Sequence, residues 1–516
     1  MYLDEQYTMY KLAYSLVKYD EYEVLHINEN DNEIWLEKYN QKTSYVIRLC
    51  HGGFDWKNHL KKDIAQVFQK TKAMKRLLIG KQVEIYNMYI SSHEPVDDWD
   101  ILKKPMQLNE KNPLKMKVYY ITEETKHKEL DRIQEETETS KVRIDGTLVE
   151  SEKENDLQNF KTHVTNALYG KRKEIENIFS YGKPRFTYML LMINLIVFFM
   201  LESSGGSTDI ENLINFGAKY NPAIIDNNEW WRIITSMFLH IGLLHLFMNM
   251  LAVYYLGITV ERIYGSIRFL VIYFLAGIGG GLASFAFTVN VSAGASGALF
   301  GLFGALLFFG LIHKKIFFQT MGKGLLILIG INIIFGFAVP QVDNGAHLGG
   351  LFAGFLASAI LHLPKKKNLS IQLAAVILYI VIITGLVVFG TQNNLNSASY
   401  QLIKIEELVK VNNYEEIVQR ATIGLEDPKD VKPHLLFQRS YANIHLNNPE
   451  LAIKDLEETI QLTDEIPEAY YNLASLYHSR GEMNKAKESI EKAYELNSKK
   501  EEFSSLYEKI IGEKPK

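Results

Sequence analysis

The middle of the chain alternates between long apolar stretches and short polar loops. Seven such stretches lie between residues 186 and 390, and each is close to the roughly 20 residues that a helix needs to cross a bilayer. Their approximate bounds are Phe186–Leu201, Ser236–Gly257, Arg268–Phe287, Ser296–Ile312, Gly324–Val339, Gly345–Leu363 and Ile371–Gly390. This pattern predicts a polytopic α-helical membrane protein.

The first 180 residues follow another pattern, in which short β-rich runs alternate with turn-forming residues and charged helices. The runs typical of strands are Glu23–Ile27, Glu33–Lys38, Ser44–Leu49, Val83–Ile90 and Met116–Ile121, and helical spacing extends over Trp56–Leu78 and His127–Glu138. We therefore predict a soluble α/β domain over residues 1–180, whose charged end, Glu150–Glu176, links it to the membrane region.

Residues 397–516 have a helical pattern that repeats with a period of 34 residues. Ala452 and Ala486 are separated by this period, as are Leu462 and Leu496, and it is the period of the tetratricopeptide repeat. The segment Pro467–Ala474 also resembles such a repeat closely. We expect an all-α domain of about two to three repeats, with a concave face for a peptide or protein partner.

Lysine and arginine are distributed unevenly over the short loops, and basic loops stay in the cytoplasm. They precede the first apolar stretch and follow the second, fourth and sixth, whereas residues 288–295 and 340–344 carry none. The basic positions are Lys171, Arg172, Lys173, Lys183, Arg185, Arg262, Arg268, Lys314, Lys315, Lys323, Lys365, Lys366 and Lys367. We therefore expect a cytoplasmic N-terminus, with the seventh helix and its linker, residues 366–396, leading to an extracytoplasmic repeat domain.

The amino-acid composition excludes several classes of partner and of site. A net charge of -4 and a pI near 6.4 give no electrostatic basis for binding nucleic acid. The single cysteine, Cys50, excludes an internal disulfide framework and a cysteine-rich metal site. The start, Met1–Glu5, lacks the basic and apolar regions of a signal peptide. Nothing in the sequence indicates a cofactor.

One acidic turn leaves two interpretations open. Asp97, Asp98 and Asp100 lie within Pro95–Asp100 and could hold a hard divalent cation through carboxylate oxygens. Acidic turns are also common on solvated surfaces, and we favour that second interpretation.

A serine flanked by small residues, Gly294-Ala295-Ser296-Gly297, opens the fourth apolar stretch. A serine hydroxyl commonly caps a helix N-terminus, and Gly297 with Gly301 forms the kind of small-residue face that packs between membrane helices. Taken alone, this segment favours capping and packing. His347 favours a functional role over capping and packing alone. It opens the sixth stretch, and an ionisable residue in a spanning helix is costly enough to be a functional candidate.

Ser296 and His347 begin stretches that both run from outside to inside, so both are expected in the outer part of the membrane. A hydroxyl is a weak nucleophile until a base takes its proton, and a neutral imidazole suits that task. The small residues around both positions would let the two helices pack closely. Because neither stretch carries a carboxylate in its apolar part, a Ser-His dyad is favoured over a Ser-His-Asp triad.

His245 and Asn249 lie one helical turn apart in the outer half of the second stretch. With the backbone N–H of Ser296, they could donate hydrogen bonds to the oxyanion of a tetrahedral intermediate. Alternatively, Asn249 could join helices by hydrogen bonds and His245 could be structural. Phe300 lies on the same helix face as Ser296, where it could support the imidazole ring or simply belong to the core.

These residues, in this order, resemble the rhomboid family of intramembrane serine proteases. The matching motifs are Gly294-Ala295-Ser296-Gly297, Ala346-His347-Leu348-Gly349-Gly350, His245-x-x-x-Asn249, Trp231-Arg232 and Glu261-Arg262. The resemblance covers about residues 186–363, and the seventh stretch and the repeats are similar to the long rhomboids of Bacillus-type bacteria. It implies a rhomboid core of six helices over residues 181–365 and a location in a bacterial cell membrane.

The resemblance also implies roles for individual residues. Ser296 would be the nucleophile, His347 the general base, and His245 and Asn249 the oxyanion donors. The remaining matches would brace the first loop and the end of the second helix, and they are Trp231, Arg232 and Glu261.

Two functions remain in competition at this point. The first is a protease that hydrolyses peptide bonds in or near transmembrane segments of membrane-protein substrates, with a further role as an adaptor in membrane-protein quality control. The second is a non-proteolytic adaptor that captures membrane proteins and recruits partners through its soluble domains. A transporter is disfavoured, because the polar residues cluster on one side of the membrane midplane.

Overall fold

The computed structural model describes residues 2–28, 32–75, 78, 80–108, 113–140 and 149–513, with the backbone alone at 171–172. It divides into two compact units. The first is Met1–Ser180 with His313–Gly322, and the second is Tyr181–Ile312 with Lys323–Lys516. The second unit holds most of the apolar helices and all of the described repeat helices.

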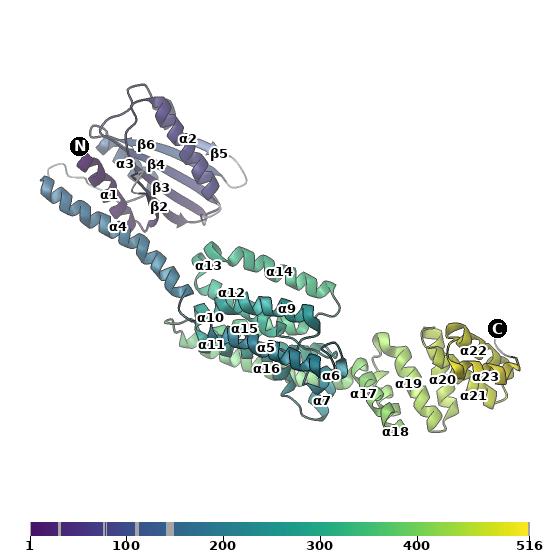
Figure 1. The fold of residues 1–516 in the computed structure, drawn as a ribbon. Helices are drawn as coiled ribbons and strands as arrows, with labels where there is room; N and C mark the ends of the chain where they lie inside the picture. Colours follow the sequence, from purple (N-terminus) through teal and green to yellow (C-terminus); the bar gives the residue numbers. More distant parts are fainter. Residues whose placement is uncertain are drawn as a thin grey trace. The chain divides into compact units, whose positions relative to one another are not determined.

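A six-stranded mixed sheet forms the centre of the first unit (Figure 1). In spatial order its strands are β1 (Glu23–Asn28), β2 (Glu33–Asn40), β3 (Thr43–His51), β4 (Gln82–Ile90), β6 (Leu114–Ile121) and β5 (Met106–Leu108). β4 pairs parallel with both β3 and β6, and the other neighbours are antiparallel. The α/β prediction is confirmed, and only the short β5 has no counterpart among the expected strands.

Helices cover both faces of this sheet. α1 (Tyr2–Tyr19), α3 (Lys126–Thr137) and α4 (Glu150–Phe179) pack on one face, and α2 (Lys57–Met74) packs on the other. The sequence pattern predicts neither α1 nor the packing of α4, which is expected only as a charged link. In the structure α4 lies beside α1 (Figure 1), because Leu157, Val164 and Leu168 form a buried apolar stripe.

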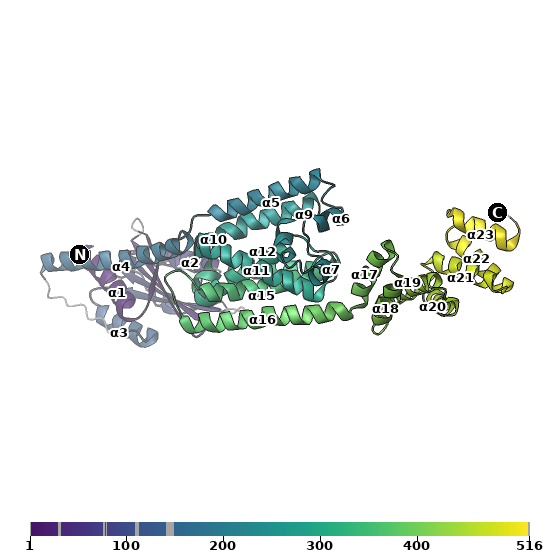
Figure 2. The same ribbon diagram turned by 90° about the horizontal axis from the view of Figure 1, so that it is seen from below.

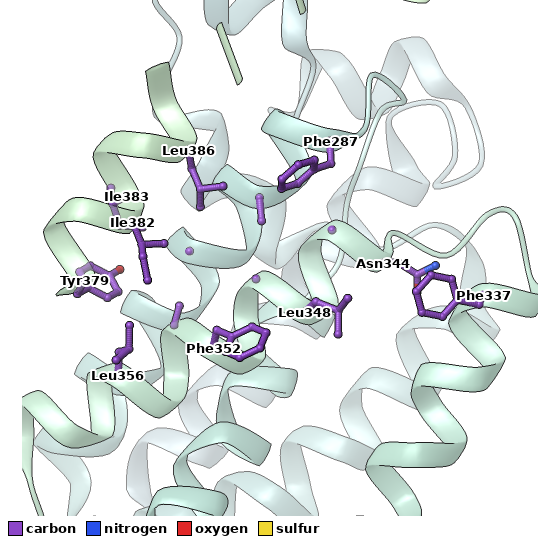
Figure 3. A pocket seen from close by; sticks show the side chains of 15 residues that line it. Phe287, Phe337, Asn344, Leu348, Phe352, Leu356, Tyr379, Ile382, Ile383 and Leu386 are labelled. Atoms are coloured by element: carbon purple, nitrogen blue, oxygen red, sulfur yellow. The ribbon is translucent and has the colours of Figure 1, made fainter. Parts of the chain in front are cut away.

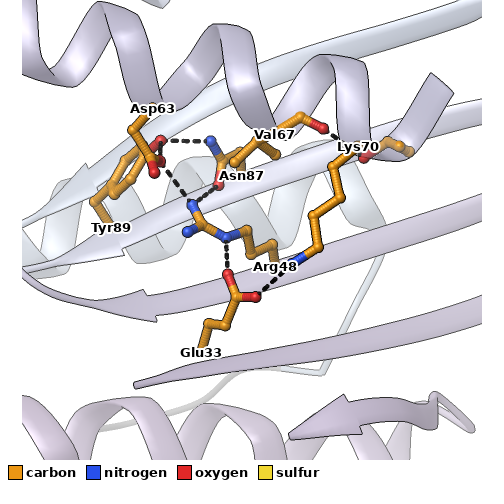
Figure 4. A network of polar contacts seen from close by, with 8 residues as sticks. Glu33, Arg48, Asp63, Val67, Lys70, Asn87 and Tyr89 are labelled. Atoms are coloured by element: carbon orange, nitrogen blue, oxygen red, sulfur yellow. Dashed lines mark hydrogen bonds and ion pairs between the residues drawn. The ribbon is translucent and has the colours of Figure 1, made fainter. Parts of the chain in front are cut away.

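A buried polar cluster joins β2, β3, β4 and α2 (Figure 4). The Arg48 guanidinium donates to Glu33 at 2.7 Å, to Asp63 at 2.9 Å and to Asn87 at 3.1 Å, and the Lys70 ammonium donates to Glu33 at 2.8 Å. Burial raises the pKa of Glu33, but the hydrogen bonds from Lys70 and Arg48 outweigh burial and lower that pKa to about 2. The carboxylate is therefore held in its charged form.

Apolar helices of near membrane-spanning length make up most of the second unit. Among the described residues, five helices are long and apolar enough to span a bilayer, and the bent pair α13 and α14 adds a sixth if it counts as one span. In chain order the apolar helices are α5 (Arg185–Ser203), α9 to α10 (Gly242–Tyr264), α11 (Ser266–Phe287), α12 (Ser296–Ile312), α13 (Lys314–Thr320), α14 (Gly322–Ala338), α15 (Asn344–Leu361) and α16 (Leu369–Asn396), of which α13 belongs to the first unit. These bounds confirm a polytopic helical protein.

The second span differs from its predicted bounds, which are Ser236–Gly257. It begins at Gly242 and continues through α9, a π-helical turn and α10 to Tyr264. The segment before it contains a short 3-10 turn, η2 (Ser236–Phe238), so the apolar pattern starts earlier than the helix. The extension carries Glu261 within the helix, not in a loop.

Glu261 joins this span to the start of α5. It is fully buried, and its carboxylate accepts hydrogen bonds from the backbone N–H groups of Arg185, Phe186 and Thr187 at 2.9, 3.0 and 2.8 Å. These N–H groups have no partner within α5, because they open the helix. The side chain therefore caps α5 and fixes it against α10.

The first loop of the second unit is also tightly built. It contains α6 (Ile210–Asn215), α7 (Asn221–Asp226) and α8 (Arg232–Thr235). The Arg232 guanidinium donates to the carbonyl oxygens of Ile214 at 2.6 Å and Ala218 at 3.2 Å, and pairs with Glu229. These contacts place Arg232 where it braces the loop.

α11, α12, α15 and α16 pack side by side (Figures 1 and 2). A Cβ atom at Gly350 would overlap the carbonyl oxygen of Gly297, and one at Gly354 would overlap the backbone of Gly301. The glycines therefore set how closely α12 and α15 approach. α16 runs along the bundle, where the Tyr379 hydroxyl donates to Leu275 O at 2.9 Å.

Antiparallel helix pairs follow α16. They are α17 (Ala398–Lys410) with α18 (Tyr414–Gly424), α19 (Lys432–His445) with α20 (Pro449–Leu462), and α21 (Pro467–Ser479) with α22 (Met483–Leu496), followed by α23 (Glu501–Ile511). Ala452 and Ala486, one repeat period apart, are both fully buried at the contacts between helices. The all-α prediction for this region is confirmed.

Candidate active site

Ser296 is the first residue of α12, and an unusual turn precedes it. Gly294 has a φ of +143°, a value that favours glycine. Its N–H donates to Ser236 O at 2.9 Å, and a Cβ added to it would lie 2.8 Å from Cε1 of His245. A glycine at position 294 therefore lets the turn before Ser296 pass close to the His245 ring.

His347 lies in the first turn of α15, and α12 supports its ring. The imidazole stacks on the Phe300 ring with centroids 4.1 Å apart and planes inclined by 13°. Phe300 is one helical turn beyond Ser296 on α12, so the stacking brings the histidine to the face that carries the serine. Phe300 therefore supports the imidazole ring, one of the two alternatives that the sequence leaves open for it.

Asp343 fixes the N-terminus of α15. Its Oδ1 accepts from the Ala346 N–H at 2.9 Å, which makes it the N-cap residue, and its Oδ2 accepts from the Ser284 hydroxyl of α11. The His347 N–H donates to the Asp343 carbonyl oxygen at 3.1 Å. A carboxylate therefore lies next to the histidine's helix turn, although it is outside the apolar part of the span.

No direct hydrogen bond joins Ser296 to His347 among the described residues. Nδ1 of His347 is buried and has no hydrogen-bond partner among the described residues. Nδ1 of His51, His240 and His362 is likewise buried and without a partner among the described residues, so this feature is not specific to His347.

His245 and Asn249 lie one helical turn apart in α9, and His245 is near the turn that leads to Ser296. His245 Nδ1 accepts from the Ile241 N–H at 3.4 Å, and its ring lies against Gly294. The buried Asn249 donates through Nδ2 to the His245 carbonyl oxygen at 2.9 Å. No hydrogen bond joins Asn249 to Ser296 in the part of the chain that the structure describes.

One further histidine of this group lies outside the sequence motifs. His240 is fully buried, and its Nε2 accepts from the Ala295 N–H at 3.5 Å. Its ring centroid lies 5.4 Å from that of His245. A second ionisable residue in the same apolar stretch is the signal that could have identified it.

Lys219 is a second residue that the sequence does not single out. The side chain is 1% exposed, and its ammonium donates to Thr288 O at 2.7 Å. Burial lowers the pKa of Lys219 to about 8, and the nearby Asp343 carboxylate opposes that shift. Thr288 begins the loop that ends at Ala295, so this buried lysine holds one end of the segment before Ser296.

Within the described residues, no group of three or more His, Cys, Asp or Glu side chains is arranged to hold a metal ion. In the acidic turn, Asp98 accepts a hydrogen bond from the Asp100 N–H at 3.0 Å, and Asp100 pairs with Lys103 at 2.7 Å in the 3-10 turn η1 (Asp100–Lys103).

An apolar cavity of about 460 Å³ is lined by residues of α11, α14, α15 and α16 (Figure 3). Leu348 and Phe352 of α15 line it together with Ile382 and Leu386 of α16. None of Ser296, His347, His245 and Asn249 reaches it. The cavity is therefore separate from these four candidate residues.

Parts of this chain match two family models and several known proteins. A family model described as "Rhomboid domain" matches residues 227–364, and one described as "Tetratricopeptide repeat" matches residues 467–500. Rhomboid protease GluP of Bacillus subtilis (strain 168) is 34% identical over 472 residues, which are 92% of this chain and 92% of that protein.

Shorter relatives match the membrane core. RHOMBOID-like protein 6, mitochondrial, of Arabidopsis thaliana is 44% identical over 28% of this chain and 48% of its own length. RHOMBOID-like protein 1 of the same plant is 40% identical over 28% of this chain and 38% of its own length. With the full-length match, these likenesses show that the chain belongs to the rhomboid family of intramembrane serine proteases, in the long form with C-terminal tetratricopeptide repeats.

Proposed function

We propose that the chain hydrolyses peptide bonds in or near transmembrane segments of membrane proteins by means of a Ser296–His347 dyad. The observation that carries this proposal is the stacking of His347 on Phe300, one turn from Ser296, across the glycine contact of α12 and α15. In the reaction His347 takes the proton of the Ser296 hydroxyl as the oxygen attacks the carbonyl carbon. It then returns that proton to the leaving amine.

The oxyanion of the tetrahedral intermediate needs donors that are in place before the reaction. The N–H of Ser296 opens α12, where the helix dipole favours negative charge. The His245 ring lies against Gly294, Asn249 bonds to the His245 carbonyl oxygen, and both are the side-chain donors in this proposal. Asn249 uses one N–H on the His245 carbonyl oxygen, which leaves its second N–H for the oxyanion.

The distribution of basic loop residues supports a cytoplasmic N-terminal domain, residues 1–180, and an extracytoplasmic repeat domain, residues 397–516. Residues 181–365 form the protease core and residues 366–396 the seventh helix in this arrangement. The location would be a bacterial cell membrane. Ser296 and His347 then lie near the outer end of the bundle, where water enters most easily.

The two soluble parts support a second role as an adaptor in membrane-protein quality control. The repeats would bind a peptide or protein partner on a concave face, as helix-pair repeats commonly do. A non-proteolytic adaptor is the alternative function, and it differs from the first in needing no hydroxyl at position 296.

Cleavage of a labelled model transmembrane substrate by purified protein in liposomes separates these functions. Ser296→Ala and His347→Ala should each lower kcat by at least about a thousandfold, because the dyad acts as a unit. Asn249→Ala should lower kcat by about 10²- to 10³-fold with little change in KM, as expected for the loss of one oxyanion donor.

Ser296→Thr serves as a matched control, because it keeps a hydroxyl while it crowds the site. It should retain more activity than Ser296→Ala. Equal cleavage by wild type and Ser296→Ala would exclude the dyad. Partner capture that survives in Ser296→Ala, with cleavage lost, would establish the adaptor role as a separate activity.

A further inference from the structure

Three consecutive residues, Lys219, Tyr220 and Asn221, contact three different parts of the second unit. Tyr220 has an extended backbone, with φ at −135° and ψ at 111°. Successive side chains of an extended segment point to opposite sides. Lys219 and Asn221 accordingly point to one side, toward the end of α11, and Tyr220 points to the other.

Lys219 holds the loop that leads to Ser296 at two points. Its backbone pairs with Ser292 in both directions, at 2.9 and 3.1 Å, and its ammonium donates to Thr288 O at 2.7 Å. Residues 288–295 join α11 to α12. The lysine therefore limits how far Ser296 can move relative to the first loop.

Asn221 connects the same place to the seventh helix. Its amide donates to the side-chain oxygen of Asn394 at 2.7 Å and to Thr288 O at 3.1 Å. Asn394 in turn donates to Phe285 O at 2.8 Å. Asn221, Asn394 and Phe285 are buried and Thr288 is half-buried, so most of these hydrogen bonds are protected from competition with water.

Tyr220 connects the segment to the first repeat helix, α17. Its hydroxyl donates to Glu407 Oε1 at 2.6 Å. A second contact lies close by, where Lys404 pairs with Asp226 at 2.9 Å. Figure 2 shows α17 beside α7, which begins at Asn221. The repeat domain is thus joined by charged hydrogen bonds to the loop that holds the serine turn.

We propose that Lys219, Tyr220 and Asn221 form a positioning segment that couples the first repeat helix and the seventh helix to the loop before Ser296. This inference rests on the proposed role of Ser296 as nucleophile. Hydrolysis needs the serine oxygen to be held close to its best position, and small displacements are costly in rate. The docked α17 supplies part of that restraint, so the repeats act on catalysis as well as on partner binding.

Tyr220→Phe in the full chain tests the coupling, because it removes only the hydroxyl that reaches Glu407. We expect kcat for a model transmembrane substrate to fall about three- to tenfold with KM unchanged, the effect of losing one charged hydrogen bond to a positioning group. Glu407→Ala should have the same effect, and the double variant should be no slower than either single one. Glu407→Gln keeps an acceptor oxygen and should restore most of the rate.

Tyr477→Phe is the matched control. Its hydroxyl donates to Glu457 Oε1 at 2.5 Å inside the repeats, so the chemical change is the same but the contact with the core is intact. We expect its kcat to equal that of wild type.

Three outcomes would overturn the coupling. They are a wild-type kcat in Tyr220→Phe, an equal loss of rate in Tyr477→Phe, and a loss of rate in Tyr220→Phe that only follows the fraction of folded protein. A wild-type chain that cleaves nothing refutes the proposed protease function itself, and that result is separate from these three.

Discussion

Asp343 shows how a single residue controls the geometry of the histidine helix. Its carboxylate accepts from the Ala346 N–H and from the Ser284 hydroxyl, so it fixes α15 at its end and against α11. Both contacts need an acceptor oxygen, and the first does not need a charge. A neutral amide can therefore serve as the cap, whereas a methyl group cannot.

We expect Asp343→Ala to destabilise the protein by about 1 kcal/mol, the usual cost of losing an N-cap, and to lower kcat because the first turn of α15 loosens. Asp343→Asn should recover most of both. Thermal unfolding in detergent and substrate cleavage measure the two effects. An alanine variant as stable and as active as the asparagine variant would show that the cap is unimportant.

Lys219 and Asp343 also show what the sequence could not reveal at this scale. The motifs predict Ser296, His347, His245 and Asn249, because serine and histidine in apolar stretches are chemically conspicuous. Lys219 and Asp343 lie in polar loops, where a charge looks solvated. Lys219 is fully buried because the loops around it pack together in the folded protein.

At the scale of elements, α12 and α15 can approach closely because the residues at their contact are glycines, which have no side chain. Gly350 lies against the carbonyl oxygen of Gly297 and leaves no space for a Cβ atom. The apolar pattern predicts both helices, and the glycines predict close packing. The apolar sequence pattern does not predict how closely the two helices approach, because that distance depends on how each helix is rotated about its axis.

Gly350→Ala should therefore destabilise the bundle by about 1–3 kcal/mol, the usual cost of overpacking, and should reduce cleavage by separating α12 from α15. Gly385→Ala on α16 is the matched control, because nothing lies within 4 Å of its added methyl group. Thermal unfolding of both variants tests this. Equal unfolding temperatures would contradict the close contact.

Strand positions in the first unit were predictable, since period-two runs define them, whereas the roles of α1 and α4 were not. α4 is highly charged, and its buried stripe of Leu157, Val164 and Leu168 is diluted by exposed charges. The position of α4 therefore depends on its packing against the rest of the first unit, as is common for helices with a weak apolar face.

The Glu33 cluster gives this sheet a dependence on pH. The folded-state pKa of Glu33 is about 2, below its usual value of 4.5, so its stabilisation is present above pH 4.5 and is lost as the pH falls toward 2. The size is on the order of 3 kcal/mol. Urea unfolding of a fragment of residues 1–180 should show a loss of stability over this range.

Glu33→Gln should remove most of this pH dependence, since glutamine does not titrate. Glu123→Gln, at an exposed carboxylate, should leave it in place. An unchanged pH profile in Glu33→Gln would assign the acid sensitivity to other groups.

At the scale of the whole molecule, the proposed topology separates the two soluble parts by the membrane. Single cysteines can test it in a Cys50→Ser background, because Cys50 is the chain's single cysteine. Lys429→Cys in the repeats should react with a membrane-impermeant maleimide on intact cells. Lys366→Cys should react only after the cells are permeabilised, and the reverse result would invert the topology.

The length of α12 has a consequence for the membrane around the protein. Seventeen residues rise about 25 Å, whereas the hydrocarbon layer is about 30 Å thick. His313, Lys314 and Lys315 follow α12 and favour the inner boundary, so its outer end stops roughly 5 Å short of the opposite one. If the proposed topology and the proposed role of Ser296 hold, bilayer thickness sets how deep a substrate must lie to meet Ser296, and we expect turnover to depend on lipid chain length.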